Sequence, residues 1–429
     1  MSARKMKDSG IEWIGEIPEE WEVRKLKYAT ICNGETLSES TKSDYTFDYI
    51  DIGSVLYEGG ITNTLEVTFE TAPSRARRVV HENDVIISTV RTYLKAIAYI
   101  DKKYESAICS TGFAVFSPKK GYDGRFLYYS LSANWFVSSV ESISTGISYP
   151  AVSSIAMGDL KSIFPPFSEQ KAIAGYLDKK CAAIDQIVVS KQKQNEQLAE
   201  YRQSLITEAV TKGLEPLAPM QDSGIEWIGE IPEKWEIKKV KYLFSVVNGA
   251  TPKSSVPEYW DGDIMWITPA DMSFEMFEIK DSRQKITAAG LASCGTTLVP
   301  KGSIVISTRA PIGQICIAGK ELCTNQGCKT LVCFEELCNE YFYYYLKVQA
   351  NVLNMLGRGT TFLELSSRDL EDFLLLLPPL AEQKEIAAYL DKKCGDIDAL
   401  REHNKNIIES LQEYKQSLIY EAVTGKIEL

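Results

Sequence analysis

The sequence predicts an α+β protein with a pseudo-two-fold internal repeat. In this fold, two mixed α/β domains are separated by two long helices that pair antiparallel. Three observations predict it: two blocks of sequence each occur twice, the segments between them are β-rich and unlike one another, and each second block carries apolar residues at a seven-residue spacing.

The repeated blocks define a frame. Residues 6–28, MKDSGIEWIGEIPEEWEVRKLKY, recur at 220–242 as MQDSGIEWIGEIPEKWEIKKVKY. PPFSEQKAIAGYLDKKCAAID, from Pro165, recurs from Pro378 as PPLAEQKEIAAYLDKKCGDID, and YRQSLITEAV at 201–210 recurs as YKQSLIYEAV at 414–423. We call these segments the repeated frame. A chain that repeats its frame while the two inserts differ is built to hold two unlike domains in like positions.

The predicted domain boundaries follow from these blocks. Residues 1–28 and 216–242 form the first part of the frame, 29–164 and 243–377 are the two variable domains, and 165–215 and 378–429 are the two helices. Each variable domain has short β-rich runs broken by Gly, Pro, Asn and Asp, typical of a mixed α/β fold.

Each frame helix should start after a Pro-Pro pair, with Ser168 as a cap in the first copy. About 40 residues of helix span about 60 Å, too long for a small domain to bury, so we expect each helix to pack on its own repeat. Ile187 and Tyr201 extend the predicted apolar stripe. The residues expected to pair at the seven-residue spacing are Leu177, Ile184, Lys191, Leu198 and Leu205, and Leu390, Ile397, Asn404, Leu411 and Leu418.

One position of this series is polar in both copies, Lys191 and Asn404. Symmetry would bring these two residues together where the helices cross, and buried polar residues of this kind fix register. The alternative is that both side chains are simply solvated.

Each variable domain carries a buried strand that runs into a polar loop, DVIISTVR at 84–91 and SIVISTR at 303–309. Arginine recognises guanine through two hydrogen bonds, and Ser or Thr can bond a base or a phosphate, so these loops are candidate DNA contacts. Two further polar loops lie at 144–149 and 357–361. The competing interpretations are an arginine in a surface ion pair and an ordinary turn. The candidates are Ser88, Thr89, Arg91, Thr92, Tyr93, Thr145, Ser148 and Tyr149 in the first domain, and Ser307, Thr308, Arg309, Pro311, Gly313, Arg358, Thr360 and Thr361 in the second.

The net charge of -11 argues against a globally basic nucleic-acid binder, although DNA needs only a local basic track. The cluster of Arg75, Arg77 and Arg78 could supply one, together with Lys95, Lys102 and Lys103. The start of the chain contains no apolar segment of a signal sequence and no run long enough for a membrane span, so we expect a cytoplasmic protein with reduced cysteines.

The five-residue steps of Cys323, Cys328, Cys333 and Cys338 are not the spacing of a metal knuckle, and no metal site is predicted.

The duplicated GIEWIGEIPEEW opening, the ISTR-x-P-I-G loop at 306–313 and the PP-x-x-EQK-x-I-x-x-YLD helix start resemble the specificity (S) subunits of type I restriction-modification enzymes over nearly the whole chain. The resemblance implies two target recognition domains, each recognising a few base pairs of an interrupted site in double-stranded DNA, and no catalysis or cofactor in this chain. It implies two methyltransferase (M) subunits that dock on the frame, bind S-adenosylmethionine and methylate adenine and, in some complexes, restriction (R) subunits. The loop motif is complete only in the second domain, because the first-domain run Ser88-Thr-Val-Arg-Thr-Tyr93 lacks the Pro and the Gly.

Three other functions are alternatives to DNA recognition. Adenine methylation by this chain is disfavoured because Phe164 stands before Pro165-Pro166 where an amine acceptor is needed. A PD-(D/E)xK-like nuclease would use Asp159 with the Glu169-Gln-Lys171 run, and Asp372 with Glu382-Gln-Lys384, but these Glu residues begin helices, where acidic residues are favoured anyway. A duplicated scaffold that binds only protein is the non-enzymatic alternative. The two histidines, His81 and His403, have no Ser or Cys partner pattern.

Overall fold

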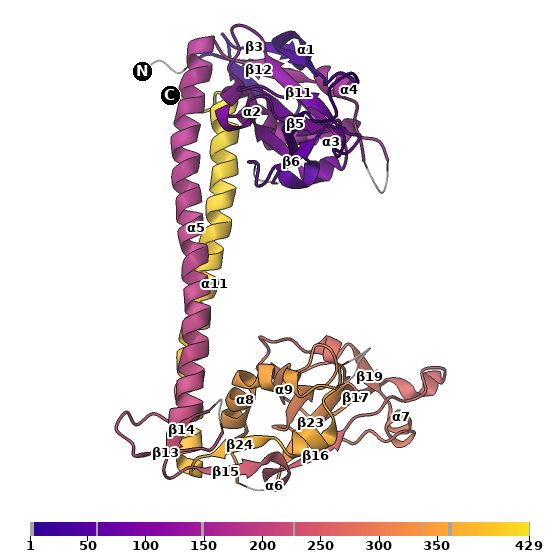
Figure 1. Ribbon diagram of the computed structural model, residues 1–429, viewed down its shortest axis with the longest axis vertical. Coiled ribbons are helices and arrows are strands. Elements are labelled where there is room, and N and C mark those ends of the chain that lie inside the picture. Colours follow the sequence, from indigo (N-terminus) through magenta and orange to yellow (C-terminus); the bar gives the residue numbers. More distant parts are fainter. Residues whose placement is uncertain are drawn as a thin grey trace. The chain divides into compact units, whose positions relative to one another are not determined.

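A computed structural model describes residues 4–56, 59–146, 150–225, 228–334, 336–358 and 363–428, with only the backbone of Tyr93. The chain divides into two compact units. Unit 1 comprises Met1–Lys191 and Lys405–Leu429, and unit 2 comprises Gln192–Asn404. Each unit therefore contains one variable domain and a part of each frame helix (Figure 1).

The variable domain of unit 1 contains two four-stranded sheets, and the frame adds two strand pairs. One sheet is fully antiparallel, whereas the other contains the parallel pair β5–β10. The orders are β4 (Thr30–Cys32), β11 (Phe113–Pro118), β8 (Val85–Ser88), β9 (Ile97–Tyr99); β6 (Leu65–Thr68), β5 (Thr46–Ile50), β10 (Ile108–Ser110), β7 (Ala76–Val79); β1 (Met6–Asp8) with β2 (Glu16–Pro18); and β3 (Glu22–Lys25) with β12 (Lys161–Phe164).

The helices of unit 1 pack mainly on the antiparallel sheet and on the frame (Figure 1). They are α1 (Leu26–Ala29), α2 (Gly124–Ser132), α3 (Asn134–Ile143), α4 (Ser154–Gly158) and the first part of α5 (Phe167–Lys212), with 3-10 turns η1 (Ile52–Ser54), η2 (Thr92–Leu94) and η3 (Lys102–Tyr104).

Unit 2 repeats this topology although its variable domain has little sequence in common with the first. Its main sheet gains a fifth strand, and its second sheet has three. The orders are β16 (Phe244–Asn248), β23 (Cys328–Cys333), β20 (Ile304–Ser307), β21 (Ile315–Ala318), β18 (Glu278–Ile279); β19 (Gln284–Ile286), β17 (Trp260–Ile267), β22 (Leu322–Thr324); β13 (Met220–Asp222) with β14 (Glu230–Pro232); and β15 (Glu236–Lys239) with β24 (Leu374–Leu377).

The helices of unit 2 follow the same order along the chain. They are α6 (Val240–Leu243), α7 (Ala288–Ala292), α8 (Asn339–Val348), α9 (Ala350–Met355), α10 (Ser367–Glu371) and the first part of α11 (Leu380–Val423), with 3-10 turns η4 (Pro257–Tyr259) and η5 (Pro269–Asp271).

The frame closes each variable domain at its two ends. In unit 1, β12 at the end of the domain pairs antiparallel with β3 just before its start, with Lys161 opposite Lys25. In unit 2, β24 pairs with β15 in the same way, with Leu374 opposite Lys239. Each domain therefore starts and ends at one place on the frame, so different inserts can occupy the same position.

The two frame helices share the core of each unit, as the apolar stripe predicted. In unit 1, Leu177, Ile184 and Leu418 are buried in one cluster with the variable domain, and Leu411 packs against it. In unit 2, Leu205, Leu390 and Ile397 are buried in the corresponding cluster, and Leu198 packs against it. Ile187 and Tyr201 are exposed instead, at 47% and 56%, so the stripe is narrower than predicted.

Polar contacts show that the helices run antiparallel within unit 2. Asn404 Nδ2 donates to Asn195 Oδ1 at 3.0 Å, whereas Asp398 lies 3.3 Å from Arg202. The partner on α11 thus moves back along the chain as α5 moves forward. Asn404 is 6% exposed, which excludes simple solvation for this residue. Lys191 belongs to unit 1, so its meeting with Asn404 stays a prediction.

The start of α5 differs from the predicted cap. The helix begins at Phe167, and Pro166 O accepts from Glu169 N and Gln170 N, so Ser168 already lies inside the first turn. The buried side chain of Gln170 instead joins the start of α5 to the variable domain. Its Nε2 donates to Pro165 O at 2.8 Å, and its Oε1 accepts from Asp123 N at the start of α2. Gln383 repeats both contacts with Pro378 O and Cys338 N.

Candidate nucleic-acid interface

In unit 1 the loop after β8 is shaped by its own hydroxyls. Ser88, 3% exposed, donates through Oγ to Val90 O at 2.6 Å. Thr89 donates through both N and Oγ1 to Gly112 O, at 2.7 and 2.9 Å. These two residues therefore use their hydroxyls to stabilise the turn. The side chains that the turn exposes belong to the residues that follow them.

The two polar loops of the first domain come together. Val90 forms a bridge with Ala151, Arg91 N donates to Pro150 O at 2.7 Å, and Val152 N donates to Thr89 O. The Oγ atoms of Thr92 and Ser144 lie 3.1 Å apart. Residues 89–92, 144–145 and 150–152 therefore lie together, which places the exposed Arg91 and Thr145 in the same part of the domain.

Unit 2 builds the same element from different side chains. Ser307 Oγ donates to Pro311 O, and Thr308 donates through N and Oγ1 to Gly327 O, at 2.8 and 3.3 Å. Leu365 N donates to Thr308 O, as Val152 N does to Thr89 O. We call these two elements the paired loops: residues 88–92 with 144–146 and 150–152, and residues 307–313 with 357–358 and 363–365.

The paired loops show that Arg91 and Arg309, which both follow a Ser-Thr pair, do not occupy equivalent positions. Arg309 and Arg358 each form a bridge with Glu364, just as Val90 and Thr145 each form one with Ala151. Val90 is therefore the counterpart of Arg309, and Arg91 lies one residue later, with a left-handed φ of 51°. The apparent recurrence of Ser-Thr-Arg in both domains does not place the two arginines at one position.

The second domain holds its arginines in ion pairs. Arg309 Nη2 lies 3.1 Å and Nε 3.2 Å from Glu364 Oε2, with the two side chains 44% and 40% exposed. Arg358, 80% exposed, contacts Asp369 at 3.0 Å. These are the ion pairs that the sequence left as the competing interpretation, but the arginines stay accessible at the surface.

The glycine of the ISTR-x-P-I-G loop is required by geometry. Gly313 has a φ of +90°, and a Cβ there would lie 3.1 Å from Ala350 O. Its N–H donates to Ser307 O, which turns the chain after Pro311 back towards the strand. The first domain replaces this turn by η2, which ends at Lys95 with a left-handed φ of 48°.

The three arginines of the predicted basic track do not form one patch. Arg75 is exposed, and its carbonyl accepts from Thr111 N, next to the glycine that Thr89 contacts. Arg77 stacks over the Phe69 ring at 4.8 Å. Arg78 follows it on β7 and so points to the opposite face, where its Nε and Nη1 are buried without a hydrogen-bond partner and burial lowers its pKa. Arg75 alone combines exposure with a place beside the paired loops.

Several candidate residues fall outside the described part of the chain. They are Ser148, Tyr149, Thr360 and Thr361, and of Tyr93 only the backbone is described.

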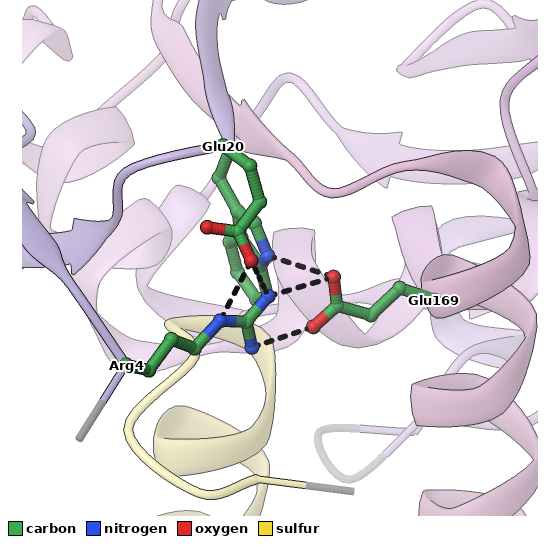
Figure 2. Close-up of polar contacts among 4 residues, drawn as sticks. Arg4, Glu20 and Glu169 are labelled. Carbon is green, nitrogen blue, oxygen red and sulfur yellow. Dashed lines mark hydrogen bonds and ion pairs between the residues drawn. The ribbon is translucent and has the colours of Figure 1, made fainter. Parts of the chain in front are cut away.

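Three of the four acidic residues of the nuclease alternative, Asp159, Glu169 and Asp372, are engaged in ion pairs. Asp159 contacts Lys25 and Lys27 at 3.0 and 2.7 Å, and in unit 2 Lys241 and Lys239 lower the pKa of Asp372 to about 2. Glu169 binds Arg4, which also contacts Glu20 (Figure 2). Over the ranges that the structure describes, no three His, Cys, Asp or Glu residues gather as a metal site, and the ten cysteines are free.

The match to a known family decides what the duplicated domains are. Residues 18–198 and 232–411 match the type I restriction modification DNA specificity domain. The chain belongs to this family. Members of the family recognise DNA for type I restriction-modification complexes and are not themselves catalytic, which confirms the prediction that the chain is not an enzyme.

Curated relatives are specificity subunits of type I restriction enzymes. The MjaIX subunit of Methanocaldococcus jannaschii is 36% identical over 188 residues, which span 43% of this chain and 43% of that relative. The MjaVIII subunit of the same organism is 24% identical over 429 residues, which span 96% of this chain and 94% of the relative.

Solved structures share the predicted fold. A chain from a type I restriction-modification system, described for its assembly and conformational transition, has a TM-score of 0.81 at 24% identity and covers 96% of this chain and 99% of its own. The HsdS subunit from Thermoanaerobacter tengcongensis has a TM-score of 0.58 at 23% identity, over 96% of this chain and 98% of its own. The fold class of two α/β domains with two long paired helices is thus confirmed. No helix within the described ranges is long and apolar enough to cross a membrane.

Proposed function

We propose that this specificity-family chain recognises a bipartite target in double-stranded DNA, with residues 29–164 on one half-site and residues 243–377 on the other. The observation that carries the proposal is the duplication of the paired loops on equivalent strands, with unlike side chains at equivalent positions. An identical scaffold with different surface residues is suited to two different short base sequences.

The chemistry of the paired loops supports direct recognition of bases. Arg309 can give two hydrogen bonds to guanine, and Glu364 beside it can accept from cytosine. Val90 and Ala151 stand at these positions in the first domain, where an apolar side chain can contact a thymine methyl group. The two half-sites should therefore differ.

We propose further that the chain positions two methyltransferase subunits on its repeated frame, with restriction subunits in some complexes. The methyltransferase subunits would bind S-adenosylmethionine and methylate adenine, because Phe164 stands where this chain would need an acceptor for the adenine amine. Two copies of the frame offer two like docking places. The cytoplasmic location predicted from the sequence belongs to this proposal.

A domain replacement tests the bipartite assignment. Residues 29–164 are replaced by a second copy of residues 243–377, since the frame closes both domains through the same strand pairing. The chimera is expressed with the methyltransferase subunits, and methylated adenines are mapped across a genome. We expect the second half-site to stay unchanged and the first to become its inverted copy, which gives a palindromic target.

The reciprocal chimera, with two copies of residues 29–164, is the matched control and should give a palindrome of the other half-site. A target that keeps both original half-sites would contradict the proposal. If complexes of the wild-type chain methylated DNA without any sequence preference, the result would favour a scaffold that binds protein only.

A further inference from the structure

In unit 1 the frame carries a filled arginine site. Arg4 contacts Glu169 through Nη1 at 2.7 Å and Nη2 at 2.9 Å, and it also bonds Glu20 (Figure 2). Its guanidinium lies 5.7 Å from the ring centroid of Trp21. The Trp21 N–H donates to the same Glu169 at 3.0 Å, so one carboxylate accepts from both the indole and the guanidinium.

The repeat in unit 2 keeps the tryptophan and the glutamate of this site but has no arginine. Trp235 and Glu382 stand for Trp21 and Glu169, but Ala218 replaces Arg4, and the exposed Lys234 replaces Glu20. Trp235 is 2% exposed, and its Nε1 is buried without a hydrogen-bond partner. Within the described ranges, no hydrogen bond or ion pair is found for the Glu382 carboxylate. A buried N–H left unpaired in this way costs stability and points to a missing group.

A cavity of about 500 Å³ lies at this place in unit 2. Ala218 and Gly213 line it, together with Glu208, Glu215 and Glu230. Gly213 lies between the cavity and the Trp235–Glu382 pair. A Cβ at this position would lie 2.9 Å from Glu382 Oε1 and 3.3 Å from Trp235 Cζ2, so the lack of a side chain leaves the cavity open towards the pair. The cavity therefore adjoins the Trp235–Glu382 pair through the backbone of Gly213, and Ala218, the counterpart of Arg4, lines it.

We propose that this cavity receives an arginine side chain of a partner subunit. A guanidinium matches it because the carboxylates on the wall exceed the single cation, Lys212, and so favour a cation over a phosphate. Its planar fork bonds both oxygens of one carboxylate, as Arg4 does with Glu169. When the guanidinium binds there, it holds Glu382 between itself and Trp235. The buried N–H of Trp235 then gains a carboxylate acceptor.

The inference rests on the proposed function only for the partner, a methyltransferase subunit. It also makes the two copies of the frame unequal, since unit 1 fills its own site. One docking place is then completed by this chain and the other by the partner.

The first test uses the full chain labelled with 5-fluorotryptophan and N-acetyl-argininamide as the probe. We expect a saturable shift of the Trp235 fluorine signal, assigned with Trp235→Phe, and none with the neutral N-acetyl-citrullinamide. Ala218→Arg supplies the missing side chain from within and should abolish the shift. The absence of a saturable shift in the wild-type chain would overturn the pocket.

The second test measures the affinity of purified methyltransferase subunits by calorimetry. Ala218→Arg and Glu382→Gln should each lower it by about tenfold, the loss expected for one charge-assisted contact. Glu385→Gln, an exposed position on the same helix, is the matched control and should leave it unchanged. Melting temperatures check that each variant folds.

The outcomes separate the two proposals. Wild-type affinity in both Ala218→Arg and Glu382→Gln would overturn the arginine contact while leaving subunit docking intact. Failure of the wild-type chain to bind the methyltransferase at all would count against the proposed function, and the probe titration would still decide whether the pocket accepts a guanidinium.

Discussion

In the proposed interface, a DNA base would compete with Glu364 for the guanidinium of Arg309. The pair with Glu364 is about two-fifths exposed on both sides, and such surface pairs stabilise by about 0–1 kcal/mol. Two hydrogen bonds from arginine to the correct base give roughly 1–3 kcal/mol of discrimination. If Arg309 contacts a base as proposed, the base would draw it away from Glu364. The ion pair would keep the side chain oriented in the absence of DNA.

Arg309→Ala should relax recognition at one base pair of the second half-site by about tenfold or more while leaving the fold intact. The measurement is the ratio of affinities of the methyltransferase complex for duplexes that differ at that pair. Arg283→Ala removes the same charge from a side chain that is 74% exposed in the same unit, and it should weaken all duplexes alike or none. Unchanged discrimination in Arg309→Ala would remove this residue from base recognition.

His81 gives unit 1 a pH-dependent contact. Its ring nitrogens lie 2.8 Å from Glu105 and 2.9 Å from Glu35, and the hydrogen bonds that it donates to these carboxylates, chiefly the one to Glu105, raise its pKa. A raised pKa in the folded state stabilises below the unfolded value, about 6.5, and the contribution is lost as pH rises through the folded value.

His81→Gln should therefore lower the melting temperature of the chain more at pH 5.5 than at pH 8.5. Thermal unfolding at the two pH values measures the difference. His403→Gln, at the exposed second histidine, is the control and should show no such dependence. An equal loss at both pH values would mean that the pairs with Glu35 and Glu105 do not contribute through charge.

At the scale of the element, the buried glutamine of each EQK run joins a frame helix to its variable domain. Gln383 is 1% exposed and bonds both Pro378 O and Cys338 N at the start of α8. Gln383→Ala should cost about 2–3 kcal/mol, because both backbone groups lose a partner in a buried place. Chemical denaturation measures this loss. Lys384→Ala, one residue on and exposed, should change little, and a similar effect of both variants would show that the glutamine bonds are not the cause.

The sequence predicts these helices better than it predicts the loops. A stripe such as Leu177, Ile184 and Leu205 repeats along one element, so its pattern is visible without tertiary contacts. The paired loops depend on bridges between residues far apart in the chain, such as Val90 with Ala151, and no local pattern reports them. For this reason the shared topology of the two variable domains, the one-residue offset of Arg91 and the role of Glu364 emerge only from the structure.

At the scale of the whole molecule, both long helices contribute to both units. Helix α5 passes from unit 1 to unit 2 after Lys191, and α11 passes from unit 2 to unit 1 after Asn404. Neither unit could therefore keep its core if one helix were removed, since each core takes buried residues from both. This mutual dependence is the physical reason to expect that the helices set the spacing of the half-sites.

Inserting one heptad after Lys191 and one after Asn404 tests that role. Seven residues keep the apolar stripe in phase and add about 10 Å of helix, which matches roughly three base pairs at about 3.4 Å each. With the methyltransferase subunits present, mapped adenine methylation should show both half-sites unchanged and a spacer about three base pairs longer. A heptad inserted after Lys191 alone shifts α5 against α11 and should abolish methylation, because each unit then loses the packing of one helix on the other. If the double insertion left the spacer at its original length, the separation of the half-sites would have to be set elsewhere than in the paired helices.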